Sequence, residues 1–89
     1  MVERTLKIQN RLGLHARAAA LFVQTANKYA SNVTIEKDGV EVNGKSIMGI
    51  MMLAAAKGCE VTVRADGADE TEAASTIEKL IHDKFNEEA

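Results

Sequence analysis

Apolar and polar residues alternate in four short segments of the chain, as they do in strands with one buried face. These segments cover residues 2–8, 33–37, 40–42 and 60–65. Elsewhere apolar residues recur every three or four positions, which predicts amphipathic helices with one buried stripe. The helical segments cover residues 16–30, 47–57 and 70–85. The pattern therefore predicts the element order β-α-β-β-α-β-α.

Residues with turn and capping preferences stand between these segments. The Asp-Gly pair at 38–39 tolerates a positive φ and predicts a hairpin between the second and third strands. Ser46 is the predicted N-cap of the second helix, and Gly58 is its predicted C-terminal stop. Asp69, followed three residues later by Glu72, resembles a capping box at the start of the last helix.

Strands with one apolar face form an antiparallel sheet that is covered on one side and open to water on the other. The apolar stripes of the helices supply the cover. We therefore expect the α+β class, as a two-layer open-faced sandwich in which three helices cover one face of a four-stranded antiparallel sheet. A chain of 89 residues is long enough for one such core and too short for two, so residues 1–89 are expected to form a single domain.

Composition and charge exclude several classes of function. The formal net charge is −2, without the basic surplus of a general nucleic-acid binder. No apolar run approaches the roughly 18–20 residues of a membrane span, so no membrane insertion is expected. Aromatic residues make up only 3% of the chain, too few for base-stacking platforms. The single cysteine, Cys59, cannot form an internal disulfide, which indicates a cytoplasmic protein.

The segment Gly13-Leu14-His15-Ala16-Arg17 combines several groups that favour an anion. His15 stands where a loop becomes the first helix, so the backbone N–H groups of Ala16, Arg17 and Ala18 lack intrahelical acceptors. The helix dipole adds partial positive charge there, and Arg17 adds a planar donor fork that suits phosphate oxygens. The imidazole of His15 is a potential nucleophile. The alternative is a solvent-facing N-cap histidine followed by a solubilising arginine.

A second candidate is the segment Gly44-Lys45-Ser46. Residues 39–46 match the P-loop string G-x-x-x-x-G-K-S, but a true P-loop follows a buried parallel strand. Residues 40–42 instead form half of a predicted hairpin, so we reject nucleotide binding. Ser46 is expected to cap a helix, and a phosphate on a serine at a helix start is well tolerated and changes the surface charge.

The second predicted helix carries more apolar residues than one buried face needs. Ile50, Leu53 and Ala54 are predicted to face inward, which leaves Ile47, Met48 and Met51 as an outer ridge. Methionine side chains suit an adaptable docking surface. The alternative is that the whole helix is covered by the core, but full burial is not expected in so small a domain.

The other titratable residues give no indication of a catalytic or metal-binding site. His82 is expected to be a solvated histidine of the last helix, and Cys59 has no histidine or second cysteine nearby in the sequence. No cluster has metal-ligand spacing, and no cofactor is expected. Residues 86–89 are predicted to be a frayed tail. Four glutamates are assigned to solvated surface and tail: Glu70, Glu72, Glu87 and Glu88.

At Gly13-Leu14-His15-Ala16-Arg17 the chain resembles the HPr family, the histidine phosphocarriers of the bacterial phosphoenolpyruvate-dependent sugar phosphotransferase system. Residues 43–49, Asn-Gly-Lys-Ser-Ile-Met-Gly, resemble the second signature of that family. The resemblance extends over the whole chain. It implies that His15 accepts a phosphoryl group at Nδ1 from the phosphorylated first enzyme and passes it to sugar-specific second enzymes. Such a protein is a stoichiometric carrier and not a stand-alone enzyme.

The resemblance also implies roles for other residues. Arg17 would contact the transferring phosphate. Ser46 would be the regulatory serine modified by HPr kinase/phosphorylase in bacteria that have this enzyme. A monomer would dock its partners through residues of the first two helices: Ala20, Leu21, Gln24, Ile47, Met48 and Met51. A second interpretation is a regulatory interaction module, such as the nitrogen-related branch of the same family, in which the phosphorylation state controls binding.

The chain departs from the family pattern at one position of the first motif. The family usually has proline after the arginine, and this chain has Ala18. Proline would fix φ and remove an N–H in the first helical turn, whereas alanine keeps the donor and loosens the turn. We therefore expect Arg17 and the phosphate to be held less firmly here.

Overall fold

The computed structural model describes residues 1–87 and contains the elements in the predicted order. The four strands are β1 (Val2–Lys7), β2 (Asn32–Lys37), β3 (Val40–Asn43) and β4 (Glu60–Asp66). The helices are α1 (Ala16–Ala26), α2 (Ile47–Met52) and α3 (Glu70–His82), followed by the short 3-10 turn η1 (Lys84–Asn86). The predicted α+β class and element order are confirmed.

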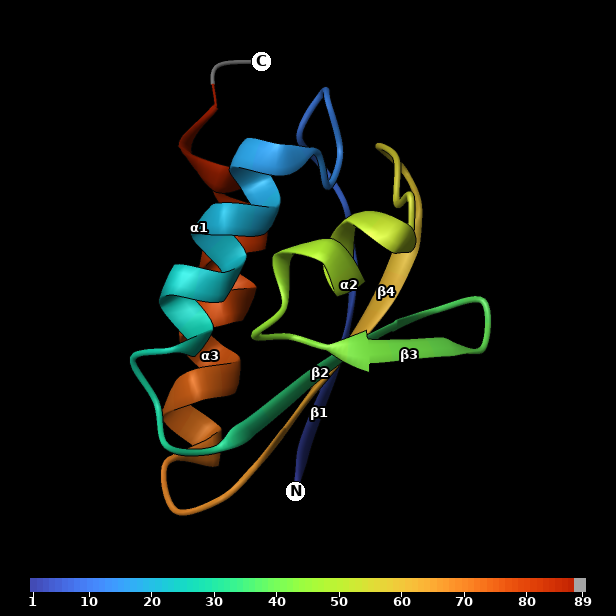
Figure 1. Ribbon diagram of the computed structural model, residues 1–89. Coiled ribbons are helices and arrows are strands. Elements are labelled where there is room, and N and C mark those ends of the chain that lie inside the picture. The colour runs from blue at the N-terminus through green and yellow to red at the C-terminus, as the bar shows by residue number, and fades with distance from the viewer. Residues whose placement is uncertain (88–89) are drawn as a thin grey trace.

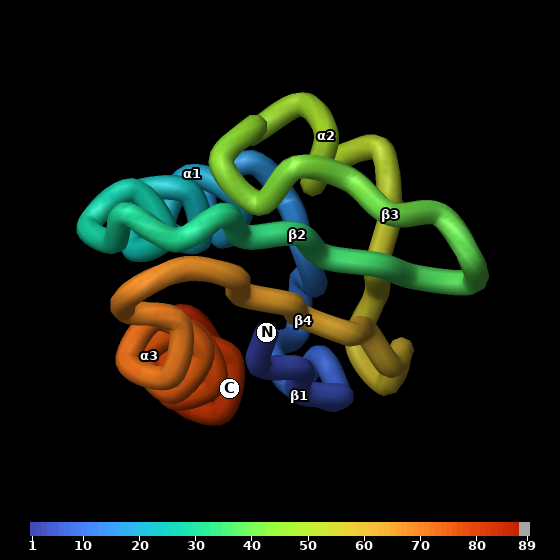
Figure 2. The backbone as a smooth tube through the Cα atoms, turned by 90° about the horizontal axis from the view of Figure 1, so that it is seen from below, coloured from blue at the N-terminus to red at the C-terminus, as the bar shows by residue number. Residues whose placement is uncertain are grey.

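The strands form one antiparallel sheet in the order β1-β4-β2-β3. β4 lies between β1 and β2, with Val63 opposite Arg4 on one side and opposite Ile35 on the other. The helices lie on one side of this sheet, with α1 and α3 next to each other (Figures 1 and 2). The expected two-layer open-faced sandwich is therefore confirmed.

Alternation along the strands separates a buried face from an open one. Val61, Val63 and Ala65 of β4 are buried under the helices, in a core that also contains Phe22 of α1 and Ile77 of α3. Most polar positions of the strands face away from that core, while Arg4 of β1 lies on the covered side and contacts Glu78 of α3 at 3.4 Å. On the open face the guanidinium of Arg64 contacts three carboxylates, at 2.6, 2.6 and 2.9 Å: Glu3, Glu36 and Glu41.

All three helices end earlier than their apolar patterns predict. α2 ends at Met52 and not at residue 57, because Ala54 has a φ of 51° and turns the chain out of the helix. Gly58 closes a different turn, in which its N–H donates to the carbonyl of Ile8 at 2.8 Å. This contact extends the pairing of β1 with β4 and leaves no room for a longer helix. α1 ends at Ala26, four residues before the predicted end.

The capping box predicted at the start of α3 is wrong. Asp69 makes no capping hydrogen bond to its own helix. Its carboxylate accepts hydrogen bonds from the backbone N–H groups of Ala30 and Ser31, both at 2.9 Å, and from the hydroxyl of Ser31. The hydrogen bond from the Ser31 hydroxyl is the main cause that lowers the pKa of Asp69, and the two backbone bonds add to it. Asp69 thus fixes the α1–β2 loop to the start of α3.

The last helix is predicted to continue to residue 85, but the chain leaves α3 three residues earlier through a left-handed turn. α3 ends at His82, and Lys84, Phe85 and Asn86 have φ values of 58°, 54° and 61°. A left-handed conformation costs about 1–2 kcal/mol for a residue with a side chain. Phe85 is completely buried in the core, and this burial offsets the cost. The turn redirects the chain toward the N-terminal end of α1 (Figure 1).

Candidate functional site

His15 is the N-cap residue of α1, as the sequence predicts. Its backbone is extended and its side chain makes no capping bond, while its carbonyl accepts the N–H of Ala19 at 2.8 Å. None of the hydrogen bonds found among residues 1–87 uses the N–H groups of Ala16, Arg17 or Ala18. Ala16 and Arg17 are exposed, whereas Ala18 is completely buried. The donors open to an anion are therefore those of Ala16 and Arg17.

The loop before His15 is held tightly against the segment after α2. Leu14 is buried, and its N–H donates to the carbonyl of Ala55 at 2.9 Å. Gly13 has a φ of 67°, and a Cβ atom there would clash with the carbonyl oxygen of Ala55. Only glycine meets both the left-handed φ and the close approach. The position of His15 thus depends on a glycine two residues before it.

We expect Gly13→Ala to destabilise the protein by about 2–4 kcal/mol, because it combines an unfavourable φ with a steric clash. Gly39→Ala is the matched control, since Gly39 also has a positive φ, 82°, but a Cβ atom added there would have no neighbour within 4 Å. The control should lose only the conformational contribution, about 1–2 kcal/mol. Urea unfolding measures both values, and equal losses would contradict the steric argument.

His15 lies in a surface hollow of about 410 Å³ that contains positive charge. The hollow is lined by Arg11, Leu12, His15, Arg17 and Glu87. The His15 side chain is 29% exposed, so an incoming group can reach the ring. Two guanidinium groups beside an accessible imidazole can bind a phosphate and place it for transfer to the ring.

The carboxylate of Glu87 contacts His15, which contradicts the prediction that Glu87 belongs to a frayed, solvated tail. Its Oε2 pairs with Nε2 of His15, and its Oε1 accepts a hydrogen bond of 3.2 Å from Nδ2 of Asn10. The Glu87 side chain is only 10% exposed. The prediction for Glu88 falls outside the described residues.

Glu87 is ionised at neutral pH. Partial burial alone would raise its pKa, but hydrogen bonds from His15 and Asn10, together with the positive charge of Arg17, outweigh burial and lower the pKa. The contact therefore contributes to stability at neutral pH and is lost as the pH falls through that lowered pKa. The sequence signalled only that this segment is anchored, through the apolar Phe85 just before it, and not that Glu87 contacts His15.

Ser46 caps α2 as predicted. Its hydroxyl accepts the N–H of Gly49 at 3.1 Å, and its carbonyl accepts the N–H of Ile50 at 3.1 Å. The preceding strand, β3, pairs antiparallel with β2 at the edge of the sheet. A P-loop requires a buried parallel strand before it, so the rejection of the P-loop match is confirmed.

The outer ridge of α2 is exposed, in agreement with the sequence prediction. Ile47, Met48 and Met51 are 41%, 75% and 43% exposed, while Ile50 is completely buried. α1 packs beside α2 and carries the other predicted docking residues. Of these, Gln24 is exposed, and Ala20 and Leu21 are half-buried. The ridge and this face of α1 are thus available to a partner.

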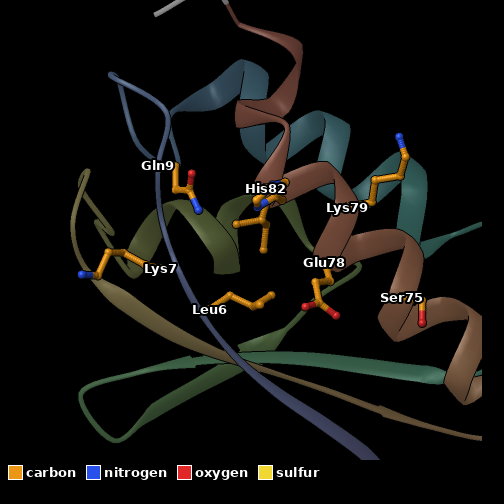
Figure 3. A pocket seen from close by; sticks show the side chains of 8 residues that line it. Leu6, Lys7, Gln9, Ser75, Glu78, Lys79 and His82 are labelled. Atoms are coloured by element: carbon orange, nitrogen blue, oxygen red, sulfur yellow. The ribbon is translucent and has the colours of Figure 1, made fainter.

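A second groove lies between β1 and α3 (Figure 3). It has a volume of about 430 Å³, and its lining includes Leu6, Glu78 and His82. None of its lining residues belongs to the hollow around His15. His82 is exposed, as predicted. Within residues 1–87, no group of three His, Cys, Asp or Glu residues is placed to hold a metal ion, and no helix is long and apolar enough to cross a membrane.

Comparisons with known proteins agree with this fold and site. Residues 2–83 match a family model described as "PTS HPr component phosphorylation site". Phosphocarrier protein HPr of Xylella fastidiosa is 50% identical over 88 residues, which are 99% of each chain. A crystal structure of HPr from Thermoanaerobacter tengcongensis has 53% identity and a TM-score of 0.96, with 100% of both chains covered. A structure of an HPr dimer from the same organism has a TM-score of 0.79 at 53% identity, with 98% of this chain and 100% of that chain covered.

The open-faced sandwich, together with these similarities over nearly the full length, defines a phosphocarrier of the phosphotransferase system. The chain belongs to the HPr family.

Proposed function

We propose that His15 is the residue that carries the phosphoryl group, and that it does so at Nδ1. The observation that carries this proposal is the hollow in which the partly exposed ring of His15 lies beside Arg11 and Arg17 at the N-terminus of α1. No hydrogen bond found among residues 1–87 uses Nδ1, while Nε2 is occupied by Glu87. The available nucleophile is therefore Nδ1.

The transfer is an in-line exchange of one bond to phosphorus for another. The lone pair of Nδ1 attacks the phosphorus, the Nδ1–P bond forms, and the bond to the donor nitrogen of the phosphorylated first enzyme breaks. Arg17 and the N–H groups of Ala16 and Arg17 hold the phosphate oxygens, and Ala18 would contribute its N–H only after a local movement. The second step reverses the first and passes the group to a sugar-specific second enzyme.

The decisive experiment is incubation of the chain with phosphoenolpyruvate and the first enzyme, followed by intact mass measurement. We expect the mass to increase by one phosphoryl group that is labile to acid and stable to base, as a phosphoamidate is. Peptide mapping should place this group on His15. An unmodified His15 would contradict the proposal.

We further propose that Ser46 is a regulatory phosphorylation site for HPr kinase/phosphorylase. Two observations support this role. Ser46 is partly accessible at the start of α2, and it directly precedes the exposed ridge residue Ile47. A phosphate there would gain from the helix N-terminus and would add negative charge at the edge of an apolar docking surface.

We expect Ser46→Asp to slow phosphoryl transfer from the first enzyme by about 10-fold or more, because the added charge opposes both apolar docking and the anionic donor. Ser46→Ala is the control, since it removes the cap at a cost of about 0.5–2 kcal/mol of stability without adding charge. Stopped-flow or quench-flow transfer rates compare the two variants. Equal rates for Ser46→Asp and the unmodified chain would contradict the regulatory role.

We propose that both phosphotransferase partners dock on one surface, composed of the α2 ridge and the adjacent face of α1. Its exposed apolar side chains lie on the helical side of the molecule, as does the start of α1 that bears His15. The residues of this surface are Ala20, Leu21, Gln24, Ile47, Met48 and Met51. A carrier must release each partner quickly, and a small adaptable surface suits such transient contacts.

We propose that residues 1–89 act as one phosphocarrier domain, as a stoichiometric carrier in the cytoplasm and not as a stand-alone enzyme. One core of apolar residues and one free cysteine support this view. We also propose a monomer, because the ridge that would dock partners must be open. A dimer is known for the similar protein of Thermoanaerobacter tengcongensis. Sedimentation equilibrium tests this, and a mass that rises toward two chains at working concentration would contradict it.

A further inference from the structure

We propose that Glu87, held by Asn10, is a positioning residue that fixes His15 in the tautomer with its proton on Nε2. This leaves the lone pair on Nδ1, the atom that must attack the phosphoryl group. The inference deepens the proposed function of His15 and rests on it.

The two oxygens of Glu87 have separate partners. Oε2 pairs with Nε2 of His15, and Oε1 accepts the Nδ2 donor of Asn10 at 3.2 Å. An ionised carboxylate can only accept hydrogen bonds, so the ring nitrogen that it contacts must carry the proton. In a neutral imidazole the other nitrogen then holds the lone pair. The contact thus selects one of two tautomers that would otherwise both be populated.

Asn10 is a buried support for this contact. It is completely buried, and Nδ2 also donates to the carbonyl of Gly13 at 2.7 Å. One amide group therefore joins the Glu87 carboxylate to the loop that leads into His15. The amide oxygen of Asn10 has no hydrogen-bond partner within residues 1–87, so the donor side alone orients this side chain.

The segment before Glu87 is shaped to deliver the carboxylate. Three successive left-handed residues, Lys84, Phe85 and Asn86, turn the chain back after α3. The completely buried Phe85 anchors that turn. A frayed tail would need neither feature.

The charges at the site fit the transfer step. When Nδ1 attacks, the Nδ1–P bond forms, the donor's bond to phosphorus breaks, and the Nε2 proton remains on the ring, which becomes a phosphoimidazolium. Glu87 faces this new positive charge, while Arg11 and Arg17 line the same hollow and can contact the phosphate. The carboxylate and the guanidinium groups therefore act on opposite charges of the same intermediate.

The test measures the tautomer directly, in the full chain without a phosphoryl donor. Two-dimensional ¹⁵N NMR at about pH 8.5, roughly two units above the ordinary histidine pKa, reports which ring nitrogen carries the proton. We expect a nearly pure Nε2–H form in the unmodified chain and a mixture of both tautomers in Glu87→Gln. Glu60→Gln is the matched control, because it removes the same charge at an exposed position outside the hollow. An Nε2–H population that is the same in Glu87→Gln and the unmodified chain overturns the proposal.

The second readout is the rate of transfer from the first enzyme at saturating concentration. We expect Glu87→Gln to be slower by about 3- to 10-fold, the effect of one partly exposed charge-assisted hydrogen bond, and Glu60→Gln to be unchanged. A Glu87→Gln rate equal to that of the unmodified chain also overturns the positioning role. Failure of the proposed function has a different signature: the unmodified chain would gain no phosphoryl group on His15, while the NMR result would still show the tautomer.

Discussion

Replacement of His15 by alanine is expected to abolish phosphoryl uptake, with a loss of at least about a thousand-fold in the transfer rate. The guanidinium groups of Arg11 and Arg17 cannot replace the imidazole, because a guanidinium is a poor nucleophile. The measurement is intact mass after incubation with phosphoenolpyruvate and the first enzyme.

His82→Ala is the matched control for this experiment. His82 is the other histidine of the chain and is exposed on α3, outside the hollow that contains His15. The control variant should accept phosphate at the normal rate. Phosphorylated protein from His15→Ala, or loss of uptake in His82→Ala, would assign the carrier role to a different residue.

Phe85→Ala is expected to cause the largest loss of stability, about 3–5 kcal/mol. Phe85 is completely buried and is one of the largest side chains in the core, so its removal leaves a cavity beneath α3. The substitution also removes the apolar burial that offsets the conformational cost of the left-handed turn at residues 84–86. Denaturant unfolding measures the loss, and Phe85→Leu, which keeps most of the apolar volume, should lose only about 1–1.5 kcal/mol.

The same variant links stability to the site. Once Phe85 no longer anchors the turn, Glu87 should leave His15, and the NMR signature of Phe85→Ala should resemble that of Glu87→Gln. A Phe85→Ala protein with full stability would show that the buried position of this ring contributes little.

Most of the fold follows from local pattern. Alternation identified β1, β2 and β4 because each has one face covered by the helices and one in water, which is the condition that produces a period of two. β3 has no buried residue, and the Asp-Gly hairpin before it identified this strand. Phe22 of α1 and Ile77 of α3, at the centres of the two predicted apolar stripes, are completely buried. Ser46 could be placed at a helix start from sequence because its capping bond joins it to Gly49, only three residues away. His15 could be placed there because the helical apolar pattern begins directly after it.

The features that sequence pattern missed depend on distant contacts. α2 stops at Met52 because the following segment pairs with the loop around Ile8. Asp69 was expected to cap its own helix, but it binds Ser31, 38 residues earlier in the chain. The contact of Glu87 with His15 joins residues 72 positions apart, and no local rule can anticipate it.

The strand order also determines how this protein can be assembled during synthesis. Among the residues that the structure describes, β4 is the only strand that pairs with β1. The pairing of Val2 with Ala65 cannot form until the ribosome has released most of the chain. Because β1 and β4 are far apart in the sequence, their pairing gives the sheet a high contact order. The chain between them must therefore close into a loop before β1 makes any stabilising contact. The loop that bears His15 follows β1 directly and is completed by residues beyond α3. We therefore expect the nascent chain to form the hollow around His15 in one late, cooperative step and not gradually.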